Sequence, residues 1–243
     1  MNMKYYINLA ECNIPILFRF KETEKYLKKY LSRKSEENRD TPIIVSEQEY
    51  NDWSFIGNKV DSFAEFCLLC QPVSDFLLCH NRCVYHAVAF SYKNLAWIIS
   101  AGSGVGKSTL CQELIKTHQD KISVINGDKP ILRADHNKVM VYPSPWNGKE
   151  GWHGAREAKL AGIFLLRRGD KTKIEKTSTK ESSIIIYLNI FQTYTKENII
   201  KAAGRLTETI VKNTPIWTLT ENDVKDGAEL VYKIIREYNN NDV

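Results

Sequence analysis

The stretch WIISAGSGVGKSTL, residues 97–110, decides the fold. An apolar run typical of a buried strand, 97–99, leads into a glycine-rich loop that ends in Gly106-Lys107-Ser108, and apolar residues at helical spacing follow. Glycines let backbone N–H groups approach an anion closely, and the N-terminus of a following helix adds partial positive charge. This is the context of a Walker A loop, with Ala101 in place of the first glycine of the strict motif. The stretch therefore predicts a phosphate-binding loop between a strand and a helix.

Individual residues of this loop have distinct expected roles. Lys107 is expected to reach the β- and γ-phosphates of ATP, and the Ser108 hydroxyl to coordinate Mg²⁺. The alternative is a glycine-rich turn that only resembles such a loop, and the intact Lys-Ser-Thr run in its strand–helix context disfavours it. ATP and Mg²⁺ are accordingly the expected cofactors. The residues expected to bind the nucleotide are Gly102, Ser103, Gly104, Val105, Gly106, Lys107, Ser108 and Thr109.

The rest of the chain alternates strand-like and helix-like patterns from residue 84 onward, which predicts an α/β fold with a mixed central sheet flanked by helices. Residues 1–80 are expected to form a β-rich portion with one helix, joined to a domain over 81–243 without a clear linker. A charged segment, 28–40, is expected to be a helix end and a solvated loop. The expected strands are 5–10, 14–20, 43–46, 85–91, 95–100, 122–126, 138–142, 162–166 with 173–176 as a hairpin partner, and 215–219. The expected helices are 61–79, 107–116, 180–191, 196–212 and 223–238.

Composition excludes several classes of protein. The chain has 243 residues, 43% hydrophobic and 26% charged, which is typical of globular proteins and unlike disordered, collagen-like or coiled-coil chains. The net charge of +5 is spread along the chain without a basic stripe, so no nucleic-acid partner is expected. The longest apolar stretches, 95–99 and 162–166, are far shorter than the roughly 20 residues that span a bilayer, so no membrane partner is expected.

The cysteines and the first residues indicate a compartment. Residues 1–6 show no pattern of a signal peptide. Cys67 and Cys70 fall in an apolar helical pattern, which favours core packing over the zinc site that their spacing with Cys79 and Cys83 would allow. A reducing cytoplasm is the expected location. The sequence also allows a homo-oligomer.

Three further segments surround the loop in the sequence. His86-Ala87 lies in a strand before the loop, Asn-Gly-Asp-Lys-Pro occupies 126–130, and Pro-Trp-Asn-Gly-Lys-Glu occupies 145–150. Together with the loop, they resemble the HPr kinase-like proteins that share the phosphoenolpyruvate-carboxykinase type of P-loop fold, in particular the short bacterial HPr-kinase-related proteins. The resemblance covers about residues 84–192. It implies this fold, and transfer of a phosphoryl group from a nucleotide to a hydroxyl, usually a serine of a protein or peptide.

Two departures from that family's pattern bear on the reaction. HPr kinases have Ser-Glu after the loop lysine, where this chain has Ser108-Thr109, and their Asp-Asp pair is Gly127-Asp128 here. Both differences argue against a bifunctional HPr kinase/phosphorylase and favour a smaller relative with a different acceptor. They leave open whether Asp128 binds Mg²⁺, accepts the proton of the acceptor, or does both.

Asp128 and His86 are the candidate catalytic residues beside Lys107. Asp128 follows a strand-like run, 123–125, and a carboxylate there can bind Mg²⁺ or take a proton from an attacking hydroxyl. The alternative for Asp128 is a turn aspartate without a catalytic role. His86 can assist as a base or orient the acceptor, and its alternative is a buried histidine with satisfied hydrogen bonds.

The segment 142–152 holds more prolines, tryptophans, glycines and charges than a plain connection needs. Trp146 is expected to form a wall of the acceptor site, and Lys149 and Glu150 are expected to meet substrate or phosphate; a rigid surface loop with an apolar contact is the alternative. Lys129 and Arg133 are further candidates for neutralising transferred charge, and surface cations are their alternative. Gln192 matches a recurring glutamine of the resembled proteins, without a physical assignment.

The expected function is transfer of the γ-phosphoryl group of ATP to a hydroxyl, most simply a serine of a peptide or small protein. A small-molecule acceptor such as free serine or a sugar is the second reading. A non-catalytic nucleotide-binding sensor is the rival from another class, because a sensor needs only the loop. An ordinary P-loop hydrolase such as a GTPase would add base-recognition and switch motifs, which the sequence does not show.

Overall fold

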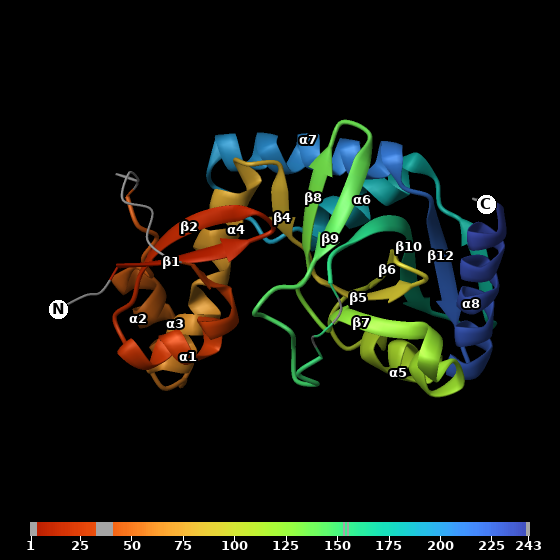
Figure 1. Cartoon of the computed structure of the whole chain (residues 1–243), viewed down its shortest axis with the longest axis horizontal. Helices are drawn as coiled ribbons and strands as arrows, with labels where there is room; N and C mark the ends of the chain where they lie inside the picture. The colour runs from red at the N-terminus through yellow and green to blue at the C-terminus, as the bar shows by residue number, and fades with distance from the viewer. Residues whose placement is uncertain (1–3, 33–40, 153, 155, 242–243) are drawn as a thin grey trace.

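The computed structural model describes residues 4–32, 41–152, 154 and 156–241, and shows a mixed α/β protein (Figure 1). A nine-stranded mixed sheet forms the larger part, and a three-stranded antiparallel sheet with short helices forms the N-terminal part. Among the helices of these residues, none has the length and apolar character needed to cross a membrane.

The large sheet runs in the order β4-β8-β9-β10-β6-β5-β7. In addition, β12 pairs with β10, and β11 pairs with β12. β6 is parallel to β10 and β10 to β12, while the other pairs are antiparallel. The strands are β4 Arg82–Val84, β5 Ala87–Tyr92, β6 Leu95–Ser100, β7 Ile122–Asn126, β8 Ile131–Asp135, β9 Lys138–Tyr142, β10 Ala158–Arg168, β11 Lys173–Lys176 and β12 Ile216–Glu221.

β10 is the longest strand and shares one of its edges between two partners. Its first residues, Ala158 and Lys159, pair with β9, and its second half, from Ile163 to Arg168, pairs with β12. The opposite edge pairs with β6. β10 therefore joins the antiparallel β4-β8-β9 group to the parallel β6-β10-β12 group.

Helices cover both faces of this sheet, and β6 shows how the sequence produces that arrangement. Side chains of a strand point alternately to opposite faces. Ala96 and Ile98 point to the face covered by α6 (Thr179–Asn189) and α7 (Glu197–Asn213). Trp97 and Ile99 point to the face covered by α5 (Lys107–Thr117) and α8 (Val224–Asn241). Because both faces are covered, β6 is a continuous apolar run rather than an alternating one.

The N-terminal part consists of a small sheet, β2-β1-β3, packed against helices. Its elements are β1 Lys4–Leu9, β2 Cys12–Leu17, α1 Glu24–Leu27, β3 Leu31–Ser32, α2 Glu47–Phe55, α3 Ser62–Leu68 and α4 Cys70–Leu78, with short 3₁₀ turns at Lys21–Thr23 and Lys28–Tyr30. Buried Glu65 organises this part, because its carboxylate accepts hydrogen bonds from the backbone N–H groups of Arg19 and Phe20 and from the hydroxyls of Thr23 and Tyr50.

Several elements differ from the expectations from sequence. Residues 43–46 form no strand, because Ile43 makes only an isolated bridge to Ile16. The helix expected over 61–79 is two consecutive helices that meet at Leu69. β11 pairs with β12 instead of forming a hairpin with β10, since both edges of β10 are already occupied. Within the charged segment 28–40, residues 33–40 lie outside the described residues.

The helix α2 and the strand β8 were not expected, whereas β4 overlaps the strand-like pattern of residues 83–85. α2 begins with a capping box, in which Ser46 accepts from the backbone N–H of Glu49 and the Glu49 side chain accepts from the backbone N–H of Ser46. Tyr50 is its only buried residue, so the helix shows little apolar periodicity. β4 and β8 are short, and they pair with each other from Arg82↔Arg133 to Val84↔Ile131.

Candidate functional site

The glycine loop connects the end of β6 to the start of α5, as the sequence predicts for a strand–loop–helix unit. Gly104 and Gly106 adopt φ values of 77° and 123°, a region that favours glycine. A Cβ atom on Gly106 would also lie 2.5 Å from Nη2 of Arg168. The backbone N–H of Leu110 donates to the Gly106 carbonyl at 2.9 Å and begins the helix. The positive end of the α5 dipole therefore lies at this loop.

Lys107 is the first residue of α5, and its side chain folds back over the loop. Its Nζ atom donates to the carbonyl oxygens of Ala101 at 3.0 Å and Gly102 at 3.3 Å, and the side chain is largely buried. The same atom lies 3.1 Å from Nε2 of His86. Burial lowers the pKa of Lys107, and the charge of Lys129 lowers this pKa further, while the charge of Asp128 opposes the shift.

His86 lies between β4 and β5, where backbone hydrogen bonds position it. The backbone N–H of His86 donates to the backbone carbonyl of Asn189 at 2.9 Å, and the backbone N–H of Ala87 donates to the backbone carbonyl of Asp128 at 2.9 Å. Burial and the charges of Lys107 and Lys129 lower the pKa of His86, against opposing effects of Asp128 and a hydrogen bond with the Asn189 side chain. His86 is therefore neutral at neutral pH, and its Nε2 atom can accept the hydrogen bond from Lys107.

Asp128 occupies the turn after β7, and its two carboxylate oxygens face different partners. Oδ1 lies 3.5 Å from Nε2 of His86, and Oδ2 makes a close ion pair with Nζ of Lys129. Lys129 also lies over the ring of Phe191, with Nζ 5.3 Å from the ring centroid. A carboxylate, an imidazole and two ammonium groups are thus gathered within one charged cluster beside the glycine loop.

Asn126, the last residue of β7, positions the Asp128 turn, and sequence reasoning missed it. Its side-chain oxygen accepts from the backbone N–H groups of Asp128 at 2.9 Å and Lys129 at 2.7 Å. Its amide nitrogen donates to the backbone oxygen and the hydroxyl of Ser144, both at 3.1 Å. Both side chains are buried. An asparagine that bonds the backbone two residues on is a known turn signal, but its link to Ser144 depends on the fold.

A cavity of about 480 Å³ opens between the glycine loop, the Asp128 turn and the 148–150 segment. Gly148 has φ of 77°, and a Cβ atom there would lie 3.0 Å from Cβ of Asp128, so this close approach depends on glycine. The cavity therefore brings together most of the predicted site residues. It is lined by His86, Ser103, Gly104, Gly106, Lys107, Ser108, Thr109, Gly127, Asp128, Gly148, Lys149 and Glu150.

The donor set in this cavity suits a hard cation next to phosphate. Ser108 offers a hydroxyl oxygen and Asp128 a carboxylate, and oxygen ligands are those that Mg²⁺ prefers. Magnesium commonly takes only one or two protein ligands and completes its shell with water and substrate phosphates. Among the described residues, no group of three or more His, Cys, Asp or Glu side chains could hold a metal ion by itself.

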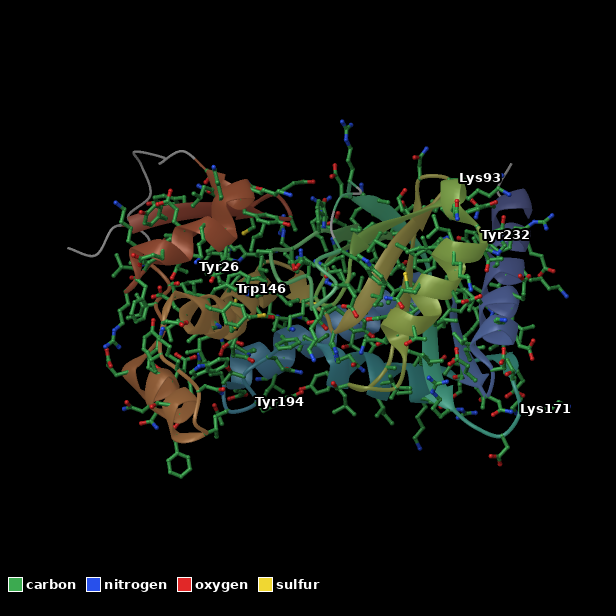
Figure 2. The ribbon with its side chains drawn as sticks, turned by 90° about the horizontal axis from the view of Figure 1, so that it is seen from below. Tyr26, Lys93, Trp146, Lys171, Tyr194 and Tyr232 are labelled. Atoms are coloured by element: carbon green, nitrogen blue, oxygen red, sulfur yellow. The ribbon has the colours of Figure 1, made fainter. Side chains whose placement is uncertain are left out.

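Three predicted substrate residues, Lys129, Trp146 and Arg133, do not line the cavity. Lys129 still lies next to it through its ion pair with Asp128, whereas Trp146 and Arg133 are directed elsewhere. Trp146 is buried against the N-terminal part, where its Nε1 donates to the Phe66 carbonyl at 2.9 Å and its ring stacks on that of Phe66. In Figure 2, Trp146 lies close to Tyr26, a residue of the N-terminal part. It packs the two parts of the chain together instead of forming a wall of an acceptor site.

Arg133 likewise lies away from the cavity. Its guanidinium pairs with Glu11 and, at 3.2 Å, with Asp135, and it lies over the ring of Tyr142. Its charge is therefore compensated at the contact between β8 and the N-terminal hairpin. The expectation that Arg133 neutralises transferred phosphate is not supported by this placement.

Arg168 and Glu221 are further residues at the loop that sequence reasoning missed. Arg168, at the end of β10, donates from Nε to the Val105 carbonyl at 2.8 Å, and its Nη1 pairs closely with the buried carboxylate of Glu221 at the end of β12. Burial raises the pKa of Glu221, and the charge of Arg168 opposes that shift. Because β6, β10 and β12 are parallel, their carboxyl ends meet at one edge of the sheet. Only the assembled sheet places these side chains beside the loop.

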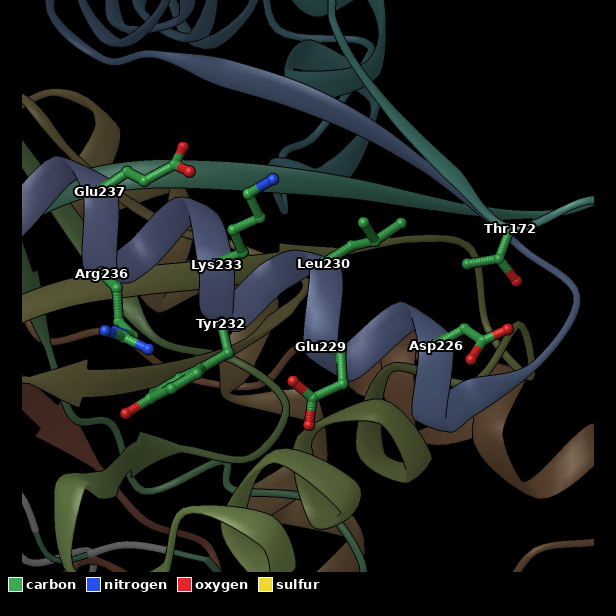
Figure 3. A pocket seen from close by; sticks show the side chains of 8 residues that line it. All are labelled: Thr172, Asp226, Glu229, Leu230, Tyr232, Lys233, Arg236 and Glu237. Atoms are coloured by element: carbon green, nitrogen blue, oxygen red, sulfur yellow. The ribbon is translucent and has the colours of Figure 1, made fainter.

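A larger hollow of about 700 Å³ lies along α8, away from the glycine loop. In Figure 3, Glu229, Tyr232 and Arg236 point to one side of this helix, and Leu230, Lys233 and Glu237 point to the other. Its lining holds both acidic and basic side chains, which point to different sides of the helix. The cavity at the glycine loop is therefore the better candidate site.

Comparison with known proteins adds little to this geometry. No protein-family model matches the chain, and no curated protein matches it. Among solved structures, one similar chain is the Hpr(Ser) kinase/phosphatase from Coxiella burnetii, at 10% sequence identity and a TM-score of 0.35, covering 64% of this chain and 95% of that chain. A structural similarity this distant carries no argument about function.

Proposed function

We propose that this protein is a phosphotransferase that moves the γ-phosphoryl group of ATP to a hydroxyl group. One observation carries the proposal: Lys107, His86 and Asp128 converge on the cavity that the glycine loop opens onto. Lowered pKa values of a lysine and a histidine in one cavity are typical of functional sites. A turn that only resembles a phosphate loop would not require this cluster.

The loop and the start of α5 would hold the phosphates. Backbone N–H groups of the loop and the positive helix end favour an anion there, and Lys107 adds a charge that can move from the Ala101 and Gly102 carbonyls to a phosphate oxygen. Lys149, which lines the opposite side of the cavity, can meet the γ-phosphate as a point charge. Bound Mg²⁺, with Ser108 and Asp128 as its protein ligands, would supply further neutralisation of phosphate charge.

Asp128 is the group best placed to accept a proton from the acceptor hydroxyl. As that proton moves to the carboxylate, the hydroxyl oxygen forms a bond to the γ-phosphorus, and the bond between this phosphorus and the β–γ bridging oxygen breaks. ADP leaves with the bonding electron pair. Neutral His86 accepts from Lys107 and lies beside Asp128, so it can hold the Lys107 ammonium next to the carboxylate without adding a third positive charge.

A serine of a peptide or small protein is the acceptor that this cavity favours. Its volume of about 480 Å³ lies in the lower part of the range for small-molecule sites, so a nucleotide leaves little room for a second complete ligand. The exposed Lys149 and Glu150 at its rim would face an acceptor that presents only its hydroxyl. Free serine or a sugar is the second candidate.

Labelled-phosphate transfer tests the proposal and separates it from a nucleotide sensor. The full chain is incubated with γ-labelled ATP, Mg²⁺ and, separately, serine-containing peptides, free serine and sugars, and nucleotide binding is measured by calorimetry on the same sample. The proposal predicts binding together with transfer to at least one class of acceptor. Tight binding without transfer or hydrolysis would favour the sensor, and absence of binding to any purine nucleotide would contradict both.

A further inference from the structure

An apolar groove of about 810 Å³ runs between α6 and α7, on the face of these helices that points away from the sheet. α6 contributes a ridge beside this groove, because Ile184 and Leu188 lie one turn apart and are 52% and 63% exposed. Ile186, between them, points into the core. The groove is lined by Thr179, Ser183, Ile184, Tyr187, Leu188, Gly204, Thr207, Glu208, Val211 and Lys212.

The absence of a side chain at Gly204 on α7 leaves the groove open. Gly204 lies in the middle of this helix, and a Cβ atom on it would meet nothing within 4 Å. Glycine is unfavourable inside a helix compared with alanine, so its presence here has a cost in helix stability that no close packing within the chain requires. The hydroxyl of Thr207, one turn further along, is buried without a hydrogen-bond partner among the described residues.

We propose that this face is the interface of a homodimer, in which the Ile184–Leu188 ridge of each copy fills the groove over Gly204 of the other. A twofold interface uses the same surface on both subunits, so it requires a surface that is complementary to itself. The α6–α7 face meets this requirement because it carries a large apolar ridge beside a groove that Gly204 leaves open.

The charges on the two helices match the same arrangement. Lys180 lies one turn before Ile184 on the ridge, and Glu208 lies one turn after Gly204 on the groove. When the ridge helix lies antiparallel to α7 with Ile184 over Gly204, Lys180 of one copy comes beside Glu208 of the other. Twofold symmetry produces this pair twice. A second copy of the chain therefore fits the face in shape and in charge.

The oligomeric state of the full chain in solution tests the dimer, independently of any phosphoryl transfer. Sedimentation velocity and light scattering over a wide range of concentration are expected to show a dimer. Leu188→Asp is expected to give a monomer at concentrations where the unsubstituted chain is dimeric. Phe55→Asp is the matched control, because Phe55 is 92% exposed on α2 and should leave the dimer unchanged.

Two further variants test the arrangement itself while preserving the fold. Gly204→Leu fills the groove and favours helix, so it should block the dimer while circular dichroism shows an intact or more stable monomer. Glu208→Lys should weaken the dimer, and Lys180→Glu combined with Glu208→Lys should restore it. A chain that is monomeric at every concentration, a dimer that survives Leu188→Asp, or a charge swap that fails to restore association would overturn the proposal. A monomer in which Leu188→Asp reduces phosphorylation of a protein acceptor would assign the groove to that acceptor instead.

Discussion

The Nζ atom of Lys107 lies 3.1 Å from Nε2 of His86, although the two residues are 21 positions apart in the chain. The antiparallel register of β5 and β6 explains this contact, because Ala87 pairs with Ser100 and places the start of β5 beside the end of β6. Burial of the imidazole next to an ammonium group favours its neutral form. The hydrogen bond therefore requires a neutral histidine, and several measurable properties of the site depend on it.

Replacing Lys107 with alanine should weaken ATP binding by about 10- to 100-fold, since a charge-assisted contact to phosphate is lost. Calorimetry with Mg²⁺ and ATP measures the change. Lys116→Ala is the control, because Lys116 is an exposed residue on the same helix that pairs with Glu113 at 3.7 Å. Equal affinity for the two variants would mean that the loop does not bind phosphate through Lys107.

Replacing Asp128 with asparagine should keep ATP binding within a fewfold and reduce transfer by about 100- to 10,000-fold, the range for loss of a general base. Asparagine keeps the size and one oxygen of the side chain but cannot accept the proton. Asp135→Asn, at the end of β8 beside Arg133, serves as the control. Transfer at the unsubstituted rate by Asp128→Asn would remove this carboxylate from the reaction.

His86 should make the protein less stable as the pH falls below 6.5. Its pKa is lowered in the folded chain, so between pH 6.5 and that lower value the unfolded chain binds the extra proton, and stability decreases by at most about 1.4 kcal/mol per pH unit. His86→Gln should flatten this part of the curve of unfolding free energy against pH, measured with urea. His118 has a lowered pKa as well and contributes with the same sign, so the informative quantity is the difference between variants.

The control for that comparison is His136→Gln, because His136 is exposed in the turn between β8 and β9. It shows how much of any change comes from removing an exposed imidazole. If His86→Gln and the unsubstituted chain lose stability in parallel below pH 6.5, the folded-state imidazole does not resist protonation, and the hydrogen bond from Lys107 is not significant.

Removing the Arg168 side chain should destabilise both the glycine loop and buried Glu221. Arg168→Ala loses the hydrogen bond to Val105 and leaves a buried carboxylate without its partner, which should cost about 1–3 kcal/mol of unfolding free energy. Adding Glu221→Gln should recover part of that loss, because the amide carries no charge. Arg167→Ala is the control on the neighbouring residue. Stability of Arg168→Ala equal to that of the double variant would show that Glu221 does not need this partner.

Glycine substitutions provide a test of the core around β10. A Cβ atom on Gly162 would lie 2.6 Å from ring atoms of both Trp97 and Trp217, so Gly162→Ala should destabilise the protein by about 1–3 kcal/mol. Gly204→Ala, with open space around the new methyl group within one chain, should instead stabilise the monomer by up to about 1 kcal/mol, measured at concentrations where the chain is monomeric. Thermal unfolding of the two variants at matched concentration gives the comparison. Shifts of the same sign would contradict the packing described around the two tryptophans.

The parts of the fold that are local in sequence could be predicted, and those that depend on distant strands could not. The strand–loop–helix over residues 97–110 has its strand pattern, glycines and helix pattern in one continuous stretch, and the structure places these elements as expected. By contrast, the partner of 173–176 depends on which edges of β10 are free, and this information lies in residues far along the chain.

The candidate site shows the same division. The cavity brings together Asp128, His86 and Lys149, which were chosen from motifs around the loop. The direction of a side chain such as Trp146 is set by packing against Phe66, which lies 80 residues away. The pairing of Arg168 with Glu221 likewise requires β10 and β12 to be neighbours, and no local pattern indicates that.

The shared edge of β10 has a mechanical consequence. Because β9 and β12 follow one another along the same side of this strand, β10 carries backbone hydrogen bonds to the β4-β8-β9 group and to β12 at once, and loss of β10 would open both groups together. The central amides of this strand, between Leu160 and Leu165, should be the last in the molecule to exchange their hydrogen for deuterium, since they open only when the whole sheet comes apart.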